Sequence, residues 1–196
     1  MTDFKGQLML IMAPSGSGKK MLFDGLGDLA DQLHLARTYT SRAKREGTEE
    51  NSKYIFITVE EFEQMIAEDA FVEWANFSGN LYGTPKSEIY DELKKTQVVF
   101  KEMELQGVEQ IKKIVPQENL TVIYVDAGSW EELQERVLAR APIDAGELEL
   151  RRQRYEEESK FKEEADVIIY NPNGGGEAAQ AHFREVVIDI IGKLDQ

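Results

Sequence analysis

The chain contains no cysteine among its 196 residues and only two histidines, His34 and His182. The lack of cysteine excludes disulfides and thiolate metal sites, and two scattered histidines predict no histidine metal cluster. Apolar runs stay well below the roughly 18 residues that a membrane helix needs, and the first residues show no signal-peptide pattern. The sequence therefore predicts a cytoplasmic protein that has no membrane partner.

Basic residues are also scarce, with 23 Lys and Arg against 37 Asp and Glu, a formal net charge of −14. Such a charge repels nucleic acids and anionic membranes, so no nucleic-acid partner is expected. A site for phosphates must then gather the few basic side chains locally. The candidate clusters are Lys19 with Lys20, Arg42 with Arg45, and Arg136 and Arg140 with Arg151 and Arg152.

Strand-like apolar runs alternate with helical patterns along the chain. The strand-like runs are Gln7–Met12, Leu35–Thr40, Tyr54–Thr58, Phe71–Phe77, Val98–Glu104, Leu120–Ala127 and Asp166–Tyr170. The helix-like segments are Lys20–Leu33, Val59–Glu68, Ser87–Lys95, Val108–Val115, Trp130–Arg140, Gly146–Glu164 and Glu177–Leu194. Capping boxes at Thr58 with Glu61 and at Ser129 with Glu132 mark two helix starts.

The β-branched runs at 98–100, 122–125 and 167–169 are typical of parallel strands buried on both faces. We therefore predict an α/β fold with a parallel core sheet flanked by helices, made of residues 1–34, 85–135 and 166–196. Residues 35–84 have shorter, alternating strands and a hairpin signal at Ser78-Gly79-Asn80, which predicts a small mixed insertion. The break at 141–146 between two helices predicts a helical lid at about 136–165.

The segment Ala13-Pro14-Ser15-Gly16-Ser17-Gly18-Lys19-Lys20 follows the first strand and precedes a helix. Two glycines let successive N–H groups point at one anion, and a lysine supplies a cation for terminal phosphates. The segment thus matches most of a phosphate-binding P-loop, with Ala13 in place of the first Gly and Lys20 in place of the final Ser or Thr. The alternative is an ordinary strand-to-helix turn.

Further motifs follow in order: Thr38-Tyr39-Thr40-Ser41-Arg42-Ala43-Lys44-Arg45, Lys53-Tyr54-Ile55-Phe56, Phe71-Val72-Glu73-Trp74-Ala75, Ser78-Gly79-Asn80-Leu81-Tyr82-Gly83-Thr84-Pro85 and Gln106-Gly107. With the P-loop, this series resembles the guanylate kinase family over nearly the whole chain. The resemblance implies a P-loop kinase fold with a core, a GMP-binding insertion and a lid. It also implies transfer of a phosphoryl group from ATP to GMP, and probably to dGMP, with Mg²⁺.

The resemblance assigns roles that the chemistry of the residue types supports. Arg42 and Arg45 carry guanidinium forks suited to a phosphate dianion, and Tyr54 and Tyr82 offer hydroxyls to it. A carboxylate facing the N1–H and amine of guanine selects that base, and Glu73 is the candidate. The remaining expected GMP contacts are Thr84 and, more weakly, Thr38, as donors to O6, and Glu104 as a second acceptor for the amine.

On the donor side the resemblance assigns residues 13–20 to ATP phosphates, with Lys19 on the transferred end. Arg136, Arg140 and Arg151 are expected to close over that group as lid arginines. Taken singly, these arginines read equally well as surface charges paired with glutamates. No metal ligand is certain, because Lys20 cannot ligate Mg²⁺ and only Glu102 remains as a candidate, through water.

The residues that depart from the family pattern, in the P-loop and at Glu102 and Glu104, leave two alternatives open. A domain of this family with a damaged P-loop could act as a GMP- or phosphopeptide-binding module with impaired catalysis. A kinase of the same fold with a changed base is also compatible with Glu104, where the family usually has Asp. The sequence gives no choice between monomer and homodimer.

Overall fold

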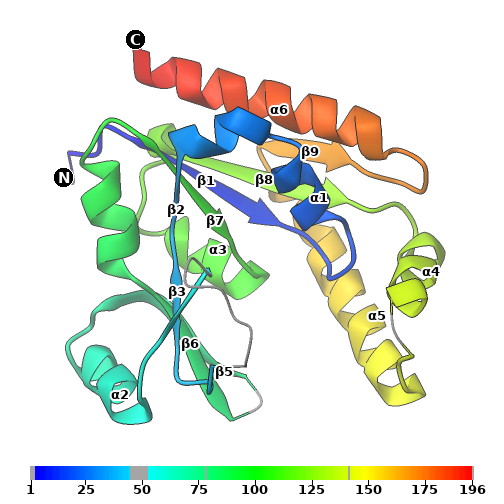
Figure 1. Cartoon of the computed structure of the whole chain (residues 1–196), viewed down its shortest axis with the longest axis horizontal. Coiled ribbons are helices and arrows are strands. Elements are labelled where there is room, and N and C mark those ends of the chain that lie inside the picture. Colours follow the sequence, from blue (N-terminus) through cyan, green and yellow to red (C-terminus); the bar gives the residue numbers. More distant parts are fainter. Residues whose placement is uncertain (1–2, 45–52, 78, 141, 196) are drawn as a thin grey trace.

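A computed structural model of the chain describes residues 3–44, 53–77, 79–140 and 142–195 (Figure 1). Its core is a five-stranded, all-parallel sheet in the order β2-β7-β1-β8-β9. These strands are Leu33–Leu35, Val98–Glu102, Gln7–Met12, Leu120–Asp126 and Val167–Tyr170 respectively. The parallel sheet predicted from the β-branched runs is confirmed.

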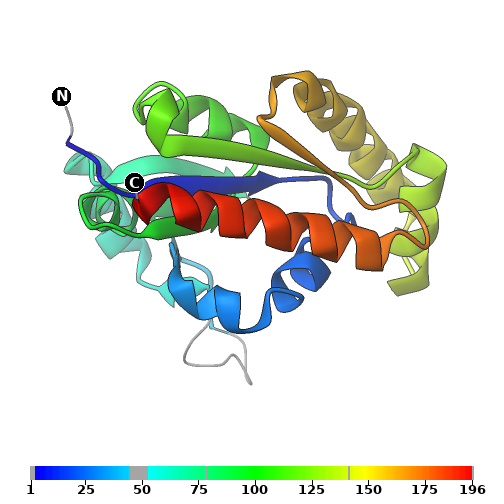
Figure 2. The ribbon, with the colours of Figure 1, turned by 90° about the horizontal axis from the view of Figure 1, so that it is seen from above.

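Helices cover both faces of this sheet, so its central strand β1 is buried at every residue (Figure 2). On one face, Met9 and Ile11 of β1 pack toward α1 (Lys19–Asp24) and α6 (Gly176–Gly192). On the other face, Leu8 and Leu10 belong to a second cluster that includes residues of α3 (Leu105–Ile111). Successive side chains of β1 therefore pack alternately into two separate hydrophobic clusters, because side chains of a strand point to opposite faces of the sheet.

A second sheet, in the order β4-β3-β6-β5, lies at one end of the core and has mixed strand directions. Its strands are Tyr54–Phe56, Thr38–Thr40, Asn80–Pro85 and Phe71–Phe77. Helix α2 (Val59–Ala67) covers it and begins at the predicted capping box of Thr58 and Glu61. Phe62 of this helix is fully buried and stacks on Phe71 at a ring distance of 4.4 Å.

The two sheets are joined by a direct passage from β2 into β3, which the sequence pattern predicts as one strand, Leu35–Thr40 (Figure 1). The passage is anchored at Arg37, whose backbone N–H donates to Glu88 Oε2 at 2.9 Å. The Arg37 guanidinium also pairs with the buried Glu88 carboxylate at 2.8 Å. This tie holds the chain between the sheets, so β2 joins the core and β3 the second sheet.

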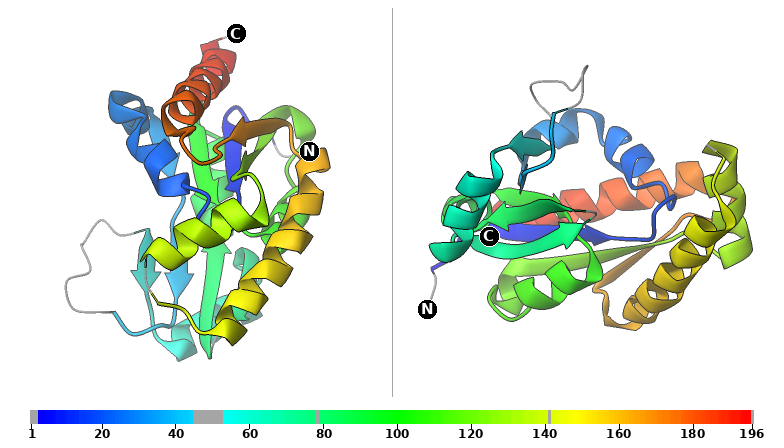
Figure 3. Two further views of the ribbon diagram at one scale, coloured as in Figure 1. Left: turned by 90° about the vertical axis from the view of Figure 1, so that its right-hand side faces the viewer. Right: turned by 90° about the horizontal axis from the view of Figure 1, so that it is seen from below.

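Helices α4 (Trp130–Arg140) and α5 (Ala145–Lys160) lie side by side at the far end of the core sheet (Figure 3). Ser129 and Glu132 exchange the two hydrogen bonds of the predicted capping box at the start of α4. Asp144 caps α5 by accepting from the Glu147 N–H at 2.9 Å. The helix predicted for 146–164 ends earlier, and residues 161–164 form a 3₁₀ turn.

Other predicted boundaries are wrong for local reasons. The predicted helix 20–33 breaks after Asp24 because Gly27 has a φ of 56°, and a 3₁₀ helix at Gly27–Gln32 follows. The predicted strand 98–104 ends at Glu102, so α3 starts three residues earlier than predicted. The helix predicted from Ser87 to Lys95 is present, but it contains a π-helical stretch at Ser87–Asp91 and ends at Leu93.

Within the described residues, every helix is too short or too polar to span a bilayer.

We expect Phe62→Ala to lower the free energy of unfolding by about 3 kcal/mol, because it leaves a cavity between α2 and the second sheet. Urea denaturation followed by circular dichroism measures the loss. Val59→Ala, on the same helix at a residue that is 45% exposed, is the matched control and should change stability by less than about 0.5 kcal/mol. Equal small losses for both variants would show that α2 is not packed as described.

Candidate functional site

The loop that follows β1 bends through two glycines with left-handed backbone, Gly16 at a φ of 99° and Gly18 at 95°. Residues with a side chain rarely adopt such angles, so these positions require glycine. Lys19 folds back over the loop and donates from Nζ to the Ala13 carbonyl oxygen at 2.6 Å. Burial lowers the pKa of Lys19, while the carboxylates of Glu102 and Glu158 oppose that shift.

The two departures from the P-loop pattern have different surroundings. Ala13 is buried and lies outside the positive-φ region, where Asp69 is the sole non-glycine residue among those described. Alanine therefore causes no backbone strain at that position. Lys20 points away from the loop, with a side chain 86% exposed, and pairs with Asp24 at 2.6 Å.

Asn171, the residue after β9, supports the loop through hydrogen bonds. Its side-chain Nδ2 donates to the Ser17 carbonyl oxygen at 2.7 Å, and its backbone N–H donates to Asp126 at 2.7 Å. The Asn171 carbonyl oxygen accepts from Arg136 at 2.7 Å, and Arg136 also donates to Asn173 at 2.6 Å. One buried asparagine thus connects the loop, the core sheet and α4.

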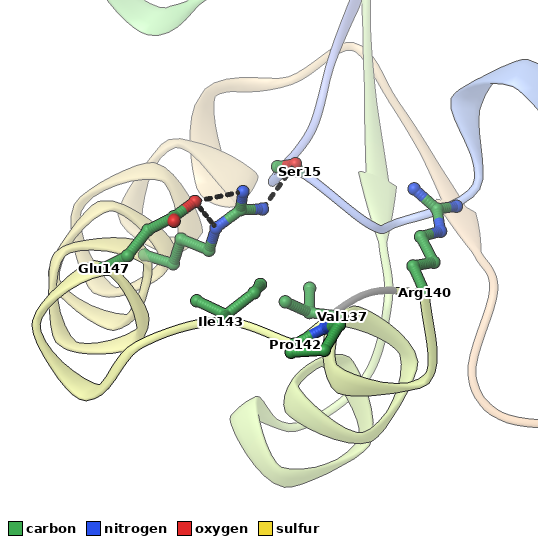
Figure 4. A pocket seen from close by; sticks show the side chains of 7 residues that line it. Ser15, Val137, Arg140, Pro142, Ile143 and Glu147 are labelled. Carbon is green, nitrogen blue, oxygen red and sulfur yellow. Dashed lines mark hydrogen bonds and ion pairs between the residues drawn. The ribbon is translucent and has the colours of Figure 1, made fainter.

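A pocket of about 330 Å³ opens between the loop and the α4–α5 pair (Figure 4). Arg151 of α5 donates to Ser15 Oγ at 3.1 Å and pairs with Glu147 at 2.7 Å. Arg140 lines the same pocket from the end of α4, together with Val137, Pro142 and Ile143. The structure therefore brings all three predicted lid arginines to the loop side, with Arg136 on Asn171 and Arg151 on Ser15.

On the second sheet, the predicted acceptor residues share one face. Tyr54 of β4 is paired with Thr38 of β3, and Glu73 of β5 is paired with Thr84 of β6. The pairing of Tyr39 with Gly83, carried one residue further, sets Thr38 opposite Thr84. Residues opposite one another on neighbouring strands have side chains on the same face. A row of four predicted residues therefore crosses the sheet.

The predicted phosphate-binding residues gather beside this row. Arg42 lies over the ring of Tyr54, at 5.5 Å from its centroid, and over Phe56 at 5.9 Å. The ring of Tyr82 meets that of Tyr54 edge-on at 6.2 Å. The Arg42 Nε is buried without a hydrogen-bond partner among the described residues, as expected for a group that serves a ligand. Arg45 lies outside the described residues.

Glu73 is held in place by Thr84, whose hydroxyl donates to Glu73 Oε1 at 2.5 Å. Burial raises the pKa of the Glu73 carboxyl, whereas the Thr84 hydrogen bond and the positive charge of Lys101 oppose that rise. Since Thr84 has one hydroxyl hydrogen and gives it to Glu73, it is not free to donate to a base in this arrangement. The expected role of Thr84 as an O6 donor therefore needs revision.

Lys101 was missed by sequence reasoning, because it continues an apolar strand and the motif residues, Glu102 and Glu104, begin only after it. It is 5% exposed and donates to Thr38 Oγ1 at 2.6 Å and to the Ala36 carbonyl oxygen at 3.2 Å. Burial lowers its pKa to about 8, against the opposing fields of Glu73 and other carboxylates. A basic residue in an otherwise buried strand was the available signal.

Glu102 and Glu104, at the end of β7, lie between the loop and the second sheet. Glu102 pairs with Lys53 at 3.0 Å, and its negative charge also favours the protonated form of Lys19. Glu104 is the residue just before α3, and its negative charge acts to raise the pKa of both Lys19 and Glu73. The described residues contain no group of three His, Asp or Glu that could hold a metal ion.

The chain is similar to known proteins along most of its length. The family model described as guanylate kinase matches residues 5–186. A guanylate kinase of Rubrobacter xylanophilus is 34% identical over 190 residues, 97% of this chain and 95% of that protein. One from Clostridioides difficile is 37% identical over 167 residues, 85% of this chain and 80% of its own length.

A solved structure shows the same fold. The crystal structure of guanylate kinase from Anaplasma phagocytophilum superposes with a TM-score of 0.67 at 20% identity. The superposition covers 94% of this chain and 85% of that one.

We expect the stability of the wild type to rise relative to Lys101→Met by about 2 kcal/mol between pH 7 and pH 10. The folded-state pKa of about 8 lies below the ordinary lysine pKa of 10.5, so the cost of burying the ammonium is present at neutral pH. It disappears as pH rises through this window. Urea denaturation at each pH measures the difference, with the exposed Lys94→Met as the control variant. Parallel curves for wild type and Lys101→Met would contradict the assignment.

Proposed function

The chain belongs to the guanylate kinase family, and we propose on that premise that it transfers the γ-phosphoryl group of ATP to GMP, giving ADP and GDP. The observation that carries the proposal is the row of Tyr54, Thr38, Thr84 and Glu73 across one sheet face, with Arg42 beside it. Glu73 in this row offers a carboxylate to a guanine edge, and Arg42 beside it offers a cation to a phosphate. The row lies on the second sheet, at one end of the core sheet.

In the proposed acceptor site, the GMP phosphate binds Arg42, Arg45, Tyr54 and Tyr82. The Glu73 carboxylate accepts from N1–H and the exocyclic amine of guanine, and Glu104 adds a second acceptor for that amine. A carboxylate cannot donate to the unprotonated N1 of adenine, so adenine is selected against. The deoxyribose analogue dGMP presents the same base edge and is a second proposed acceptor.

In the proposed donor site, residues 13–20 surround the ATP phosphates and Lys19 serves the transferred group. Arg136, Arg140 and Arg151 from the α4–α5 pair close over that group and exclude water. Phosphoryl transfer asks little covalent chemistry of the protein, so positioning and positive charge supply the catalysis. We thus propose three parts in the chain: a core, a GMP-binding insertion at residues 35–84 and a lid at about 136–165.

Magnesium enters as part of the MgATP substrate. Lys20 has no lone pair to offer a metal, and its ammonium is turned toward Asp24. Glu102, the one candidate ligand, lies 3.0 Å from Lys53 and would act through water. The metal is therefore held mainly by phosphate oxygens and water, as Mg²⁺ often is in such sites.

No observation favours the alternative of a phosphopeptide-binding module. The contacts of Lys19 with Ala13, of Arg151 with Ser15 and of Arg136 with Asn171 support the kinase proposal instead. We place the enzyme in the cytoplasm, as a monomer or homodimer, with ATP and GMP as its small-molecule partners. The nucleotide that the enzyme prefers as acceptor decides whether its base specificity has changed.

A coupled assay of ADP release tests the function directly. With MgATP, we expect kcat/KM to be highest for GMP and dGMP, lower for IMP, which lacks the amine, and lower by at least about 100-fold for AMP. Preference for AMP would establish a changed base. Tight GMP binding by calorimetry without GMP-dependent turnover would instead establish a binding module.

Two neighbouring lysines provide a matched pair. Lys19→Ala should lower kcat by about 100-fold or more, because it removes the buried cation at the loop. Lys20→Ser should leave kcat within about threefold of the wild type, because its ammonium is exposed and paired outside the loop. A large gain of activity in Lys20→Ser would show instead that Lys20 impairs the metal side of the site.

A further inference from the structure

Lys101 is a buried cation that the proposed reaction does not yet use. It lies on β7 among the buried residues of that strand, and its Nζ donates to Thr38 Oγ1 and to the Ala36 carbonyl oxygen. An ammonium carries three donors and no acceptor, so the direction of the bond to Thr38 is fixed while Lys101 is protonated. The Thr38 oxygen accepts from it.

This direction matters because a hydroxyl has one hydrogen and two acceptor positions. Since Thr38 accepts from Lys101, its own hydrogen remains available to another acceptor. The hydroxyl of Thr84, opposite Thr38 on the next strand, is already donated to Glu73. Two threonines with similar sequence signals therefore have different hydrogen-bonding roles on this face.

The face then presents a donor at Thr38 and an acceptor at Glu73. Guanine offers the complementary edge, with the O6 acceptor beside the N1–H and amine donors. Adenine has the opposite pattern at those positions, a donor amine beside an unprotonated nitrogen. The arrangement of hydroxyl hydrogens thus discriminates between the two bases, in addition to the charge of Glu73.

We propose that Lys101 is a positioning residue that orients the Thr38 hydroxyl as a hydrogen-bond donor to the carbonyl oxygen of the acceptor base. The inference rests on the proposed function and deepens it, since Lys101 acts through Thr38 and need not touch the substrate. It assigns to Thr38 the O6 contact that the sequence pattern gives first to Thr84.

Carboxylates from three elements surround the buried Lys101 ammonium and favour its charged form. Glu73 of β5, Glu88 of the segment after β6 and Glu102 of β7 stabilise the ammonium, and Lys53 opposes them.

The test is GMP binding by isothermal titration calorimetry, without ATP, for wild type and Lys101→Met at pH 7. We expect Lys101→Met to bind GMP about tenfold more weakly, the effect of one hydrogen bond.

A double-mutant cycle tests whether the effect passes through Thr38. Thr38→Val should weaken GMP binding about tenfold, and adding Lys101→Met to it should change binding by less than about twofold. The KM for ATP should stay at the wild-type value in every variant. Lys94→Met, an exposed lysine paired with Asp91, is the matched control for loss of a positive charge.

Additive effects of the two substitutions would overturn the inference and leave the proposed function intact. Equal GMP affinity of wild type and Lys101→Met at pH 7 would do the same. A wild type that binds no GMP at any pH would overturn the proposed function, and the inference with it.

Discussion

The glycine-containing loop after β1 depends on one buried side chain, Asn171. A loop with unpaired backbone groups cannot be buried without cost, and the Asn171 amide supplies the partner for the Ser17 carbonyl oxygen. The same contact leaves no room at residue 18, where a Cβ atom would lie 2.5 Å from Asn171 Nδ2. Gly18 is therefore required twice, for its positive φ and for this close approach. Through its own carbonyl oxygen, Asn171 also fixes Arg136, so loop and lid helix share one support.

Much of the fold follows from local pattern, because buried parallel strands and capped helices leave strong signals in the sequence. The β-branched runs predict the core strands, and the capping boxes predict where α2 and α4 begin. The failures occur where a distant residue decides. The run from Leu35 to Thr40 looks like one strand, but the carboxylate of Glu88, which lies 51 residues beyond Arg37, divides it between two sheets.

The candidate site is predictable to the extent that its residues stand in motifs. Tyr54, Glu73 and Tyr82 are found that way, and the sheet register places them on one face. Arg42 is found that way too, and it lies over the Tyr54 ring. Asn171 and Lys101 are not found, because each acts by reaching across to another element. Only tertiary packing gives the amide and the ammonium their partners.

The acceptor face also shows why residue type alone underdetermines recognition. Thr38 and Thr84 carry the same hydroxyl, and each can donate or accept. The neighbour decides which: a carboxylate takes the Thr84 hydrogen, and an ammonium leaves the Thr38 hydrogen free for a ligand. A buried charge behind each threonine therefore decides which way its hydroxyl donates.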